Sequence, residues 1–168
     1  MPQVLVVDEQ KCTGCELCVL YCSFEKTQTF GRARSRVYIV TEEEKGVCLP
    51  SVCLQCEEPV CALVCPVDAL NRDNKTGIVN KDEELCIKGC TLCIKACPFG
   101  AIELDPVTNK MMKCDLCGGN PVCARVCPTE AIQYLEAEQP GLSRKRRGMK
   151  TLTFMRYALA KTEGGGQK

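Results

Sequence analysis

Residues 12–22 of the chain read CTGCELCVLYC, a stretch whose four cysteines follow the spacing Cys12-x2-Cys15-x2-Cys18-x3-Cys22. The first three stand on one tight loop. Three thiolates so placed can bind three irons of a single 4Fe-4S cubane while the loop amides donate hydrogen bonds to its sulfurs. The fourth cysteine, at the start of a helical turn, points the other way, and in two-cluster ferredoxins it ligates the other cluster. The stretch therefore predicts iron–sulfur ligation.

The pattern returns three more times along the chain. Each later motif ends in Cys-Pro-x-x-Ala followed by Leu or Ile, which makes it an internal repeat. The proline directs the chain away and withholds a backbone donor, whereas the first motif has Ser23 in its place. Four motifs in tandem predict four 4Fe-4S clusters, bound through sixteen of the seventeen cysteines. The later motifs are Cys53-x2-Cys56-x4-Cys61-x3-Cys65, Cys86-x3-Cys90-x2-Cys93-x3-Cys97 and Cys114-x2-Cys117-x5-Cys123-x3-Cys127.

Other uses of so many cysteines fit the sequence less well. Zinc sites use paired CxxC units at a longer separation and often include histidine, and the chain has no histidine. The same lack excludes Rieske ligation and histidine-based general base catalysis. A disulfide scaffold needs an oxidising compartment, but residues 1–8 show no basic leader and too short an apolar run for a signal peptide. We therefore expect a cytoplasmic protein with reduced thiols.

Composition limits the classes of protein further. The chain has 168 residues, of which only 5% are aromatic and none is Trp, so its core is thin and needs a staple such as bound metal. A net charge of +1 argues against a nucleic-acid partner. No stretch approaches the roughly 20 apolar residues of a membrane span.

Short strand and turn signals lie between the cysteine motifs. Residues 73–77 and 105–110 read as hairpin turns between short apolar runs. The fold class that these signals predict is α+β, with small hairpins, short helices and loops around inorganic centres. Strands are predicted at 37–40, 69–72, 78–80, 101–104 and 111–113, and helices of a turn or two at 92–96 and 122–126.

The four motifs resemble those of the four-cluster ferredoxin-like electron-transfer subunits of the DMSO reductase iron–sulfur subunit family. The resemblance runs from about Val4 to Leu135, and the compact second motif, CLQCEEPVC at 53–61, is most similar to the small cytoplasmic members. It implies two pseudo-symmetric ferredoxin-like lobes with interleaved motifs. The boundaries that we expect are 1–47 with 98–139 for an outer lobe, 48–97 for an inner lobe, and 140–168 for a C-terminal extension, a candidate docking helix.

The resemblance also implies which cysteines share a cluster, because the family pairs outer motifs with outer and inner with inner. The third motif departs from the family pattern by one extra residue, which Gly89 can absorb with a positive φ. Carried over, the ligand sets are Cys12, Cys15, Cys18 and Cys127 for cluster 1; Cys22, Cys114, Cys117 and Cys123 for cluster 2; Cys53, Cys56, Cys61 and Cys97 for cluster 3; and Cys65, Cys86, Cys90 and Cys93 for cluster 4.

Two features remain outside the motifs. Cys48 has no motif partner, and we expect it to be a small buried apolar residue. Beyond Pro140 the chain carries the basic run Arg144 to Arg147 and several apolar side chains. This tail is either a docking element for a partner or a second copy, or a strap on its own lobe, and the sequence leaves both readings open.

No substrate-binding or catalytic constellation is visible, so we expect catalysis to belong to a partner. The resemblance implies a non-catalytic subunit that relays single electrons between the molybdenum- or tungsten-cofactor subunit of a cytoplasmic oxidoreductase and a further partner, such as a flavin subunit or a ferredoxin. Aldehyde oxidoreductase is the first choice, before formate dehydrogenase and hydrogenase. The alternatives are a free polyferredoxin, which would more often be strongly acidic, and a cluster storage or maturation protein.

Overall fold

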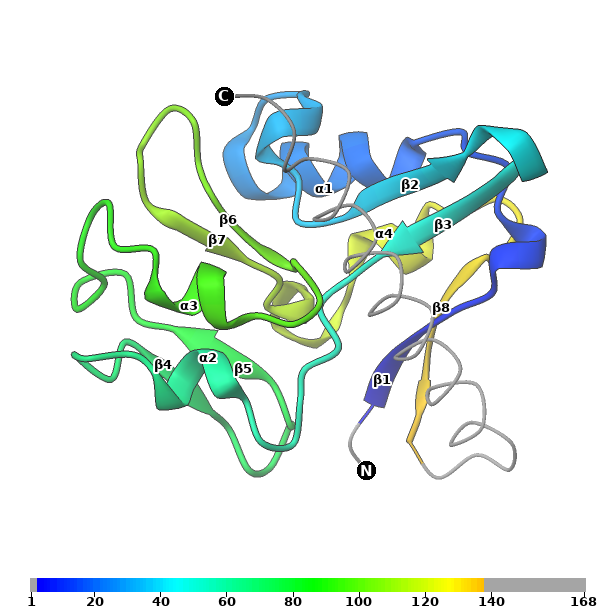
Figure 1. The fold of residues 1–168 in the computed structure, drawn as a ribbon. Coiled ribbons are helices and arrows are strands. Elements are labelled where there is room, and N and C mark those ends of the chain that lie inside the picture. Colours follow the sequence, from blue (N-terminus) through cyan, green and yellow to red (C-terminus); the bar gives the residue numbers. More distant parts are fainter. Residues whose placement is uncertain (1–2, 138–168) are drawn as a thin grey trace.

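The computed structural model describes residues 3–137, and within this range the chain forms four two-stranded antiparallel sheets joined by short helices (Figure 1). This mixture agrees with the predicted α+β class. The C-terminal extension 140–168 lies outside the described residues. The strands are β1 (Gln3–Val7), β2 (Tyr38–Glu42), β3 (Val47–Ser51), β4 (Leu70–Arg72), β5 (Val79–Lys81), β6 (Ile102–Leu104), β7 (Met111–Lys113) and β8 (Ile132–Glu136).

The helices within 3–137 are short, apart from one of eleven residues that follows the first cysteine loop. None of these helices is long and apolar enough to cross a bilayer. The predicted helix at 92–96 is confirmed as α3, and that at 122–126 as α4. The α-helices are α1 (Leu17–Thr27), α2 (Val60–Leu63), α3 (Leu92–Ala96) and α4 (Val122–Arg125), and the 3-10 helices are η1 (Glu9–Lys11), η2 (Arg32–Arg34), η3 (Glu43–Lys45) and η4 (Leu116–Gly119).

The first and last described strands pair with each other. β1 and β8 run antiparallel, with Gln3 opposite Glu136, so the two ends of the described chain lie side by side (Figure 1). Asp8 extends the pairing, because its N–H donates to the Ala131 carbonyl at 2.8 Å. Cys12 follows shortly after Asp8, and the last motif ends shortly before Ala131. The pairing therefore brings the first and fourth cysteine motifs together.

The other three sheets are hairpins between neighbouring strands, and the two predicted hairpins are confirmed. Asp73 Oδ1 accepts the Lys75 N–H at 2.7 Å in the turn between β4 and β5. Asp105 Oδ1 accepts the Val107 N–H at 2.8 Å in the turn between β6 and β7. Such Asx turns satisfy backbone donors that a tight reversal leaves without strand partners. The third hairpin joins β2 to β3 and contains the predicted strand at 37–40.

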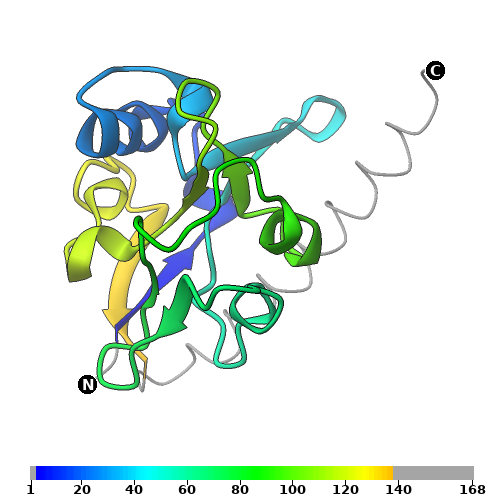
Figure 2. The same ribbon diagram turned by 90° about the vertical axis from the view of Figure 1, so that its left-hand side faces the viewer.

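Two groups of buried side chains hold these elements together. α1 packs against α4 and α2 against α3, and both views separate the two helix pairs (Figure 1, Figure 2). One buried group surrounds α1 and β8. In the other, Ile102 and Met111 of the β6–β7 hairpin join Leu70 and Val79 of the β4–β5 hairpin. The lobe boundary expected between residues 97 and 98 stays a prediction.

Candidate iron–sulfur centres

The first cysteine loop turns sharply before it enters α1. Gly14 and Glu16 both have positive φ, at 70° and 59°, and this reversal aims successive side chains at one point. The thiols of the first three motif cysteines and of Cys127 line one hollow of about 300 Å³. Burial raises the pKa of Cys18 to about 12, and the negative charges of the neighbouring Cys12 and Cys127 thiolates add to the shift. Four thiols from the two ends of the described chain therefore meet at one site.

A second set gathers where α1 meets η4 and α4. Burial raises the pKa of the Cys123 thiol, and the charges of Cys114, Cys22 and Cys117 act in the same direction. Lys26 of α1 ties the two segments together, since its Nζ lies 2.7 Å from a carboxylate oxygen of Asp115. Although burial opposes it, this contact lowers the pKa of Asp115.

The backbone of the η4 loop is bent to present these thiols. Leu116 and Cys117 take left-handed conformations, with φ of 52° and 50°. Asp115 caps the loop, because its side chain accepts the Cys117 N–H at 3.1 Å. On the opposite side, the Arg36 N–H donates to Cys22 Sγ at 3.3 Å. The structure thus brings Cys22 of the first motif beside the three loop cysteines of the fourth.

A third set lines a hollow of about 440 Å³ between the second and third motifs. Burial raises the pKa of Cys61 to about 11. The positive charge of Lys113 opposes that rise, and the charges of Cys53 and Cys97 reinforce it. The described residues that surround this hollow include four cysteines and one cation: Cys53, Cys56, Cys61, Cys97 and Lys113.

The fourth set is built on the loop with the extra residue. Burial raises the pKa of Cys93, and the charges of Cys86 and Cys90 act in the same direction. Gly89 has φ of +77°, as expected, and its N–H donates to the Asn109 carbonyl at 3.0 Å. Cys65 follows α2, which packs against α3; its membership of this set stays a prediction.

The Cys-Pro-x-x-Ala repeat has a structural role that sequence reasoning missed. The residue before each alanine, which is Asp68, Gly100 or Glu130, has positive φ. In two of the three repeats this turn lets the alanine N–H donate back to the cysteine, from Ala69 to Cys65 Sγ at 3.3 Å and from Ala131 to Cys127 Sγ at 3.2 Å. Hydrogen bonds of this kind stabilise a thiolate. The signal was present in the repeat itself, since every copy keeps a small residue at the donor position.

Cys48 differs from the expectation of a buried apolar residue. It is half-buried in β3, and its charge raises the pKa of Cys12, where burial is the largest cause of the shift. A Cβ added to Gly14 would lie 2.7 Å from Cys48 Sγ. Cys48 therefore packs against the first cysteine loop, a contact that depends on the β2–β3 hairpin and that local spacing does not reveal.

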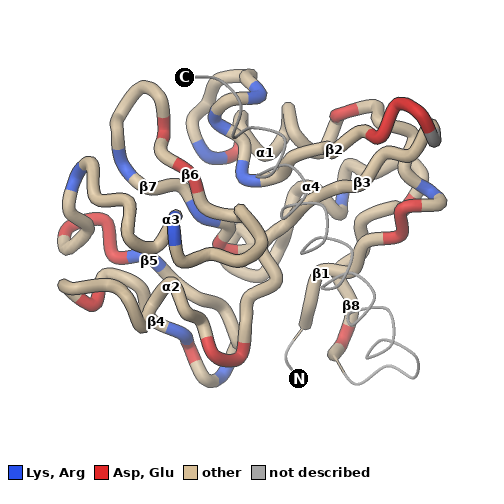
Figure 3. The backbone as a smooth tube through the Cα atoms, in the orientation of Figure 1, with Lys and Arg blue, Asp and Glu red and all other residues tan. Residues whose placement is uncertain are grey.

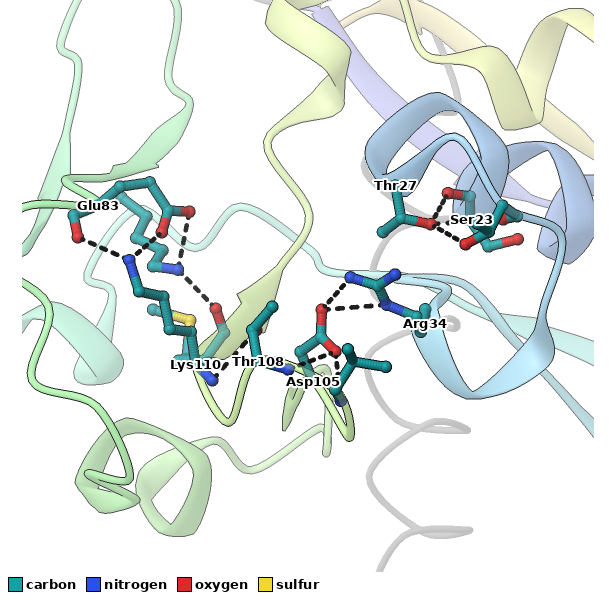
Figure 4. A network of polar contacts seen from close by, with 11 residues as sticks. Ser23, Thr27, Arg34, Glu83, Asp105, Thr108 and Lys110 are labelled. Atoms are coloured by element: carbon teal, nitrogen blue, oxygen red, sulfur yellow. Dashed lines mark hydrogen bonds and ion pairs between the residues drawn. The ribbon is translucent and has the colours of Figure 1, made fainter.

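A polar network joins the segment after α1 to the β6–β7 hairpin (Figure 4). The Arg34 guanidinium donates to Asp105 Oδ2 from Nε at 3.1 Å and from Nη2 at 2.7 Å. Although burial alone would raise the pKa of Asp105, Arg34 and the turn amides of Val107 and Thr108 hold it at about 2. The network fixes the hairpin that carries Lys113 against the first cysteine segment.

The chemistry of these donors fits 4Fe-4S clusters. Four thiols face the first hollow and four the third, and backbone N–H groups donate to the sulfurs of Cys22, Cys65 and Cys127. Thiolates are the ligands of such clusters, and amide hydrogen bonds to sulfur tune them. Within residues 3–137, no three His, Cys, Asp or Glu side chains are arranged around a single metal ion. A cubane instead takes one thiolate at each of four iron corners.

Comparisons with known proteins agree with this donor chemistry. The family described as "4Fe-4S dicluster domain" matches residues 45–137. NADH-dependent phenylglyoxylate dehydrogenase subunit beta of Aromatoleum evansii is 39% identical over 78% of this chain and 30% of its own length. The polyferredoxin-like subunit of aliphatic sulfonate oxidoreductase of Pyrococcus furiosus is 37% identical over 73% and 70%. The electron transfer subunit of thiosulfate reductase of Salmonella typhi is 34% identical over 84% and 79%.

The hairpins, the cysteine loops and these likenesses define a ferredoxin-like electron-transfer protein that binds multiple 4Fe-4S clusters. The chain belongs to the 4Fe-4S dicluster domain family, to which the iron–sulfur subunits of dimethyl sulfoxide, polysulfide and thiosulfate reductases are related. It spans 30% of the phenylglyoxylate dehydrogenase subunit, 70% of the aliphatic sulfonate oxidoreductase subunit and 79% of the thiosulfate reductase subunit.

Proposed function

We propose that this chain is the non-catalytic electron-transfer subunit of a cytoplasmic oxidoreductase complex and carries four 4Fe-4S clusters. When bound, each cluster accepts and releases one electron at a time. The chain's own residues hold the thiolates in place, donate hydrogen bonds to them and shield them from water. The observation that carries the proposal is the meeting of each end cysteine with a distant loop, most clearly Cys127 with the loop of Cys12 and Cys15.

The ligand sets that we propose are those implied by the family pairing. The hollow shared by Cys12 and Cys127 and the hollow shared by Cys53 and Cys97 support clusters 1 and 3. The electrostatic contacts of Cys123 support cluster 2. In full, the sets are Cys12, Cys15, Cys18 and Cys127; Cys22, Cys114, Cys117 and Cys123; Cys53, Cys56, Cys61 and Cys97; and Cys65, Cys86, Cys90 and Cys93.

The neighbourhoods of these sets support an order within the fold. Cys18 of the first set raises the pKa of Cys123 in the second, after the larger effects of burial and its nearer thiols. Cys53 of the third raises the pKa of Cys114 in the second, where burial is again the largest cause. Cys61 of the third and Cys86 of the fourth pack against the same buried group. We infer the order first, second, third, fourth.

The catalytic partner that we propose carries a molybdenum or tungsten cofactor, with an aldehyde oxidoreductase as the first choice. Relatives named as subunits of a dehydrogenase, an oxidoreductase and a reductase support a subunit role. The test is anaerobic purification of the native complex and identification of the proteins that co-elute. A catalytic oxidoreductase subunit is the expected companion, and a chain that elutes alone with its clusters intact would favour a free polyferredoxin.

Two measurements test the clusters themselves. Iron and acid-labile sulfide should each amount to about sixteen per chain, four for each cubane. Zinc without sulfide would overturn the proposal. In Cys22→Ser, the EPR signal of the set with Cys114, Cys117 and Cys123 should change, while the signal of the set with Cys12 should not. The reverse pattern would contradict the pairing.

A further inference from the structure

One lysine is buried in the middle of the protein, at the end of β7. The Lys113 side chain belongs to a residue only 5% exposed. Its Nζ donates to the Val79 carbonyl and the Cys114 carbonyl, both at 2.7 Å, and to Gln55 Oε1 at 3.2 Å. A lysine ammonium has three protons, and these three acceptors use all of them. All three are neutral groups, so the hydrogen bonds solvate the charge without cancelling it.

Gln55 holds this lysine in place. It is itself buried, and it lies between Cys53 and Cys56 in a left-handed conformation with φ of 47°. Its Oε1 accepts the Val79 N–H at 2.9 Å as well as the Lys113 proton, and its Nε2 donates to the Cys114 carbonyl at 2.8 Å. The Gln55–Lys113 pair therefore links two cysteine loops that are far apart in the sequence.

The charge of Lys113 acts on two different cysteine sets. Lys113 lines the hollow of Cys53 and Cys61 directly. It also precedes Cys114 of the second set. Burial raises the pKa of Cys61 and of Cys114, and in both cases the Lys113 charge pulls the pKa back down. A group that favours a thiolate at both places favours any added negative charge there.

The hollow of the first set has a different surrounding. Its described lining includes the carboxylate of Glu16 and no Lys or Arg. Reduction adds one electron to a cluster whose ligands are already anionic, and net charge and burial near a cluster are among the factors that set its potential. A cation acts more strongly in a buried, low-dielectric site than at the surface. The cation at the centre and the carboxylate at the first set therefore push potentials in opposite directions.

We propose that Lys113, positioned by Gln55, selectively raises the reduction potential of the cluster held by Cys53, Cys56, Cys61 and Cys97, and to a smaller extent that of the cluster held by Cys22, Cys114, Cys117 and Cys123. The two middle positions of the inferred order are thus the preferred resting places of an electron. This inference rests on the ligand sets proposed above.

The test is an EPR-monitored redox titration of the full chain, purified anaerobically, with Lys113→Met. Met keeps much of the length of the side chain and removes the charge. The third cluster should be reduced only at lower potential, with its oxidised-to-reduced ratio at a fixed potential raised about tenfold, which corresponds to about 59 mV for one electron. The second cluster should shift in the same direction by less, and the first and fourth should not shift.

Each titrating signal is assigned beforehand with one ligand variant for each set. Cys15→Ser, Cys117→Ser, Cys56→Ser and Cys90→Ser serve this purpose, because each should perturb one signal. Lys113→Arg, which keeps the charge, should restore much of the native potential. The matched control is Lys110→Met on the same hairpin, whose side chain is 42% exposed and pairs with Glu83. Removal of that solvated charge should leave all four potentials within error of the native values.

A second variant covers the case in which Lys113→Met does not fold. Gln55→Glu keeps the lysine and adds a carboxylate beside it, so it should lower the same two potentials. Full iron content with unchanged potentials in the folded variants, or an equal shift of all four clusters, would overturn the role of Lys113 and leave the ligand sets standing. If the ligand variants perturb signals in another grouping, the proposed sets fail instead.

Discussion

Two hollows in this protein are lined by cysteines of the same kind of motif, yet their surroundings differ. The hollow of Cys12 and Cys127 has the carboxylate of Glu16 in its lining. The acidic β2–β3 turn belongs to the same half of the chain (Figure 3). The hollow of Cys53 and Cys97 is lined by a buried ammonium, that of Lys113.

This difference separates what a cysteine motif does from what its setting does. The spacing of thiols selects the kind of cofactor, and it is nearly the same in both regions. The electrostatic environment comes from residues on other elements, such as β7. A relay whose stations share one chemistry can therefore differ in potential from station to station.

The largest expected effect is the loss of a ligand on either side of this comparison. Cys127→Ala should remove about four of about sixteen irons, because one cubane loses a corner ligand. Cys97→Ala should remove the same amount and also lower the Tm further, since Cys97 packs against both buried groups. Iron analysis and bleaching of the visible absorbance on heating measure the two effects. Equal Tm values for the two variants would contradict the difference.

The next effect compares the two glycines that turn the first and third cysteine loops. Gly14 and Gly89 both have positive φ, so alanine at either costs about 1–2 kcal/mol of backbone strain. An alanine Cβ at position 14 would also lie 2.7 Å from Cys48 Sγ, whereas at position 89 the nearest atom, Asn109 Nδ2, is 3.6 Å away. Gly14→Ala should therefore destabilise the protein by about 1 kcal/mol more than Gly89→Ala, as for other overpacked sites.

A double variant isolates the contact with Cys48. Cys48→Ala alone should leave the iron content unchanged, because this cysteine is outside the proposed ligand sets. Combined with Gly14→Ala, it should recover the extra loss of Tm but not the strain. If Cys48→Ala loses iron by itself, Cys48 is a ligand and the first site needs to be redrawn.

The smallest effect concerns the ion pair that joins the two regions. Asp105→Asn weakens two hydrogen bonds from Arg34, and charged hydrogen bonds contribute about 1.5–3 kcal/mol. The pKa of Asp105 is about 2 in the folded chain, below its unfolded value of about 3.9. The stabilisation is therefore complete above about pH 4 and is lost as the pH falls toward 2.

The measurement is the difference in unfolding free energy between the native chain and Asp105→Asn as a function of pH. Hydrogen exchange at the amides of Val107 and Thr108 gives an independent reading, because both donate to Asp105. The difference should be constant from neutral pH to about pH 4. A difference that already disappears near pH 6 would show that the ion pair contributes little.

Local sequence rules predicted the parts of this fold that depend on near neighbours. The hairpin turns at Asp73 and Asp105 follow from short polar side chains that bond to amides two residues on. The positive φ of Gly89 follows from one inserted residue between two ligands that must still face the same point. The family resemblance added the grouping of the motifs, which spacing alone leaves open.

The sequence by itself determined the cofactor, because thiol spacing within a loop is fixed by bond lengths and a few backbone angles. It also determined the short elements between the loops. Only the tertiary structure decided that Lys113 is buried beside Gln55 and that Cys48 touches Gly14. These contacts join residues more than thirty positions apart, and they form only when separate hairpins pack against each other. Packing of distant segments, which no local pattern encodes, therefore sets the electrostatic differences between like sites.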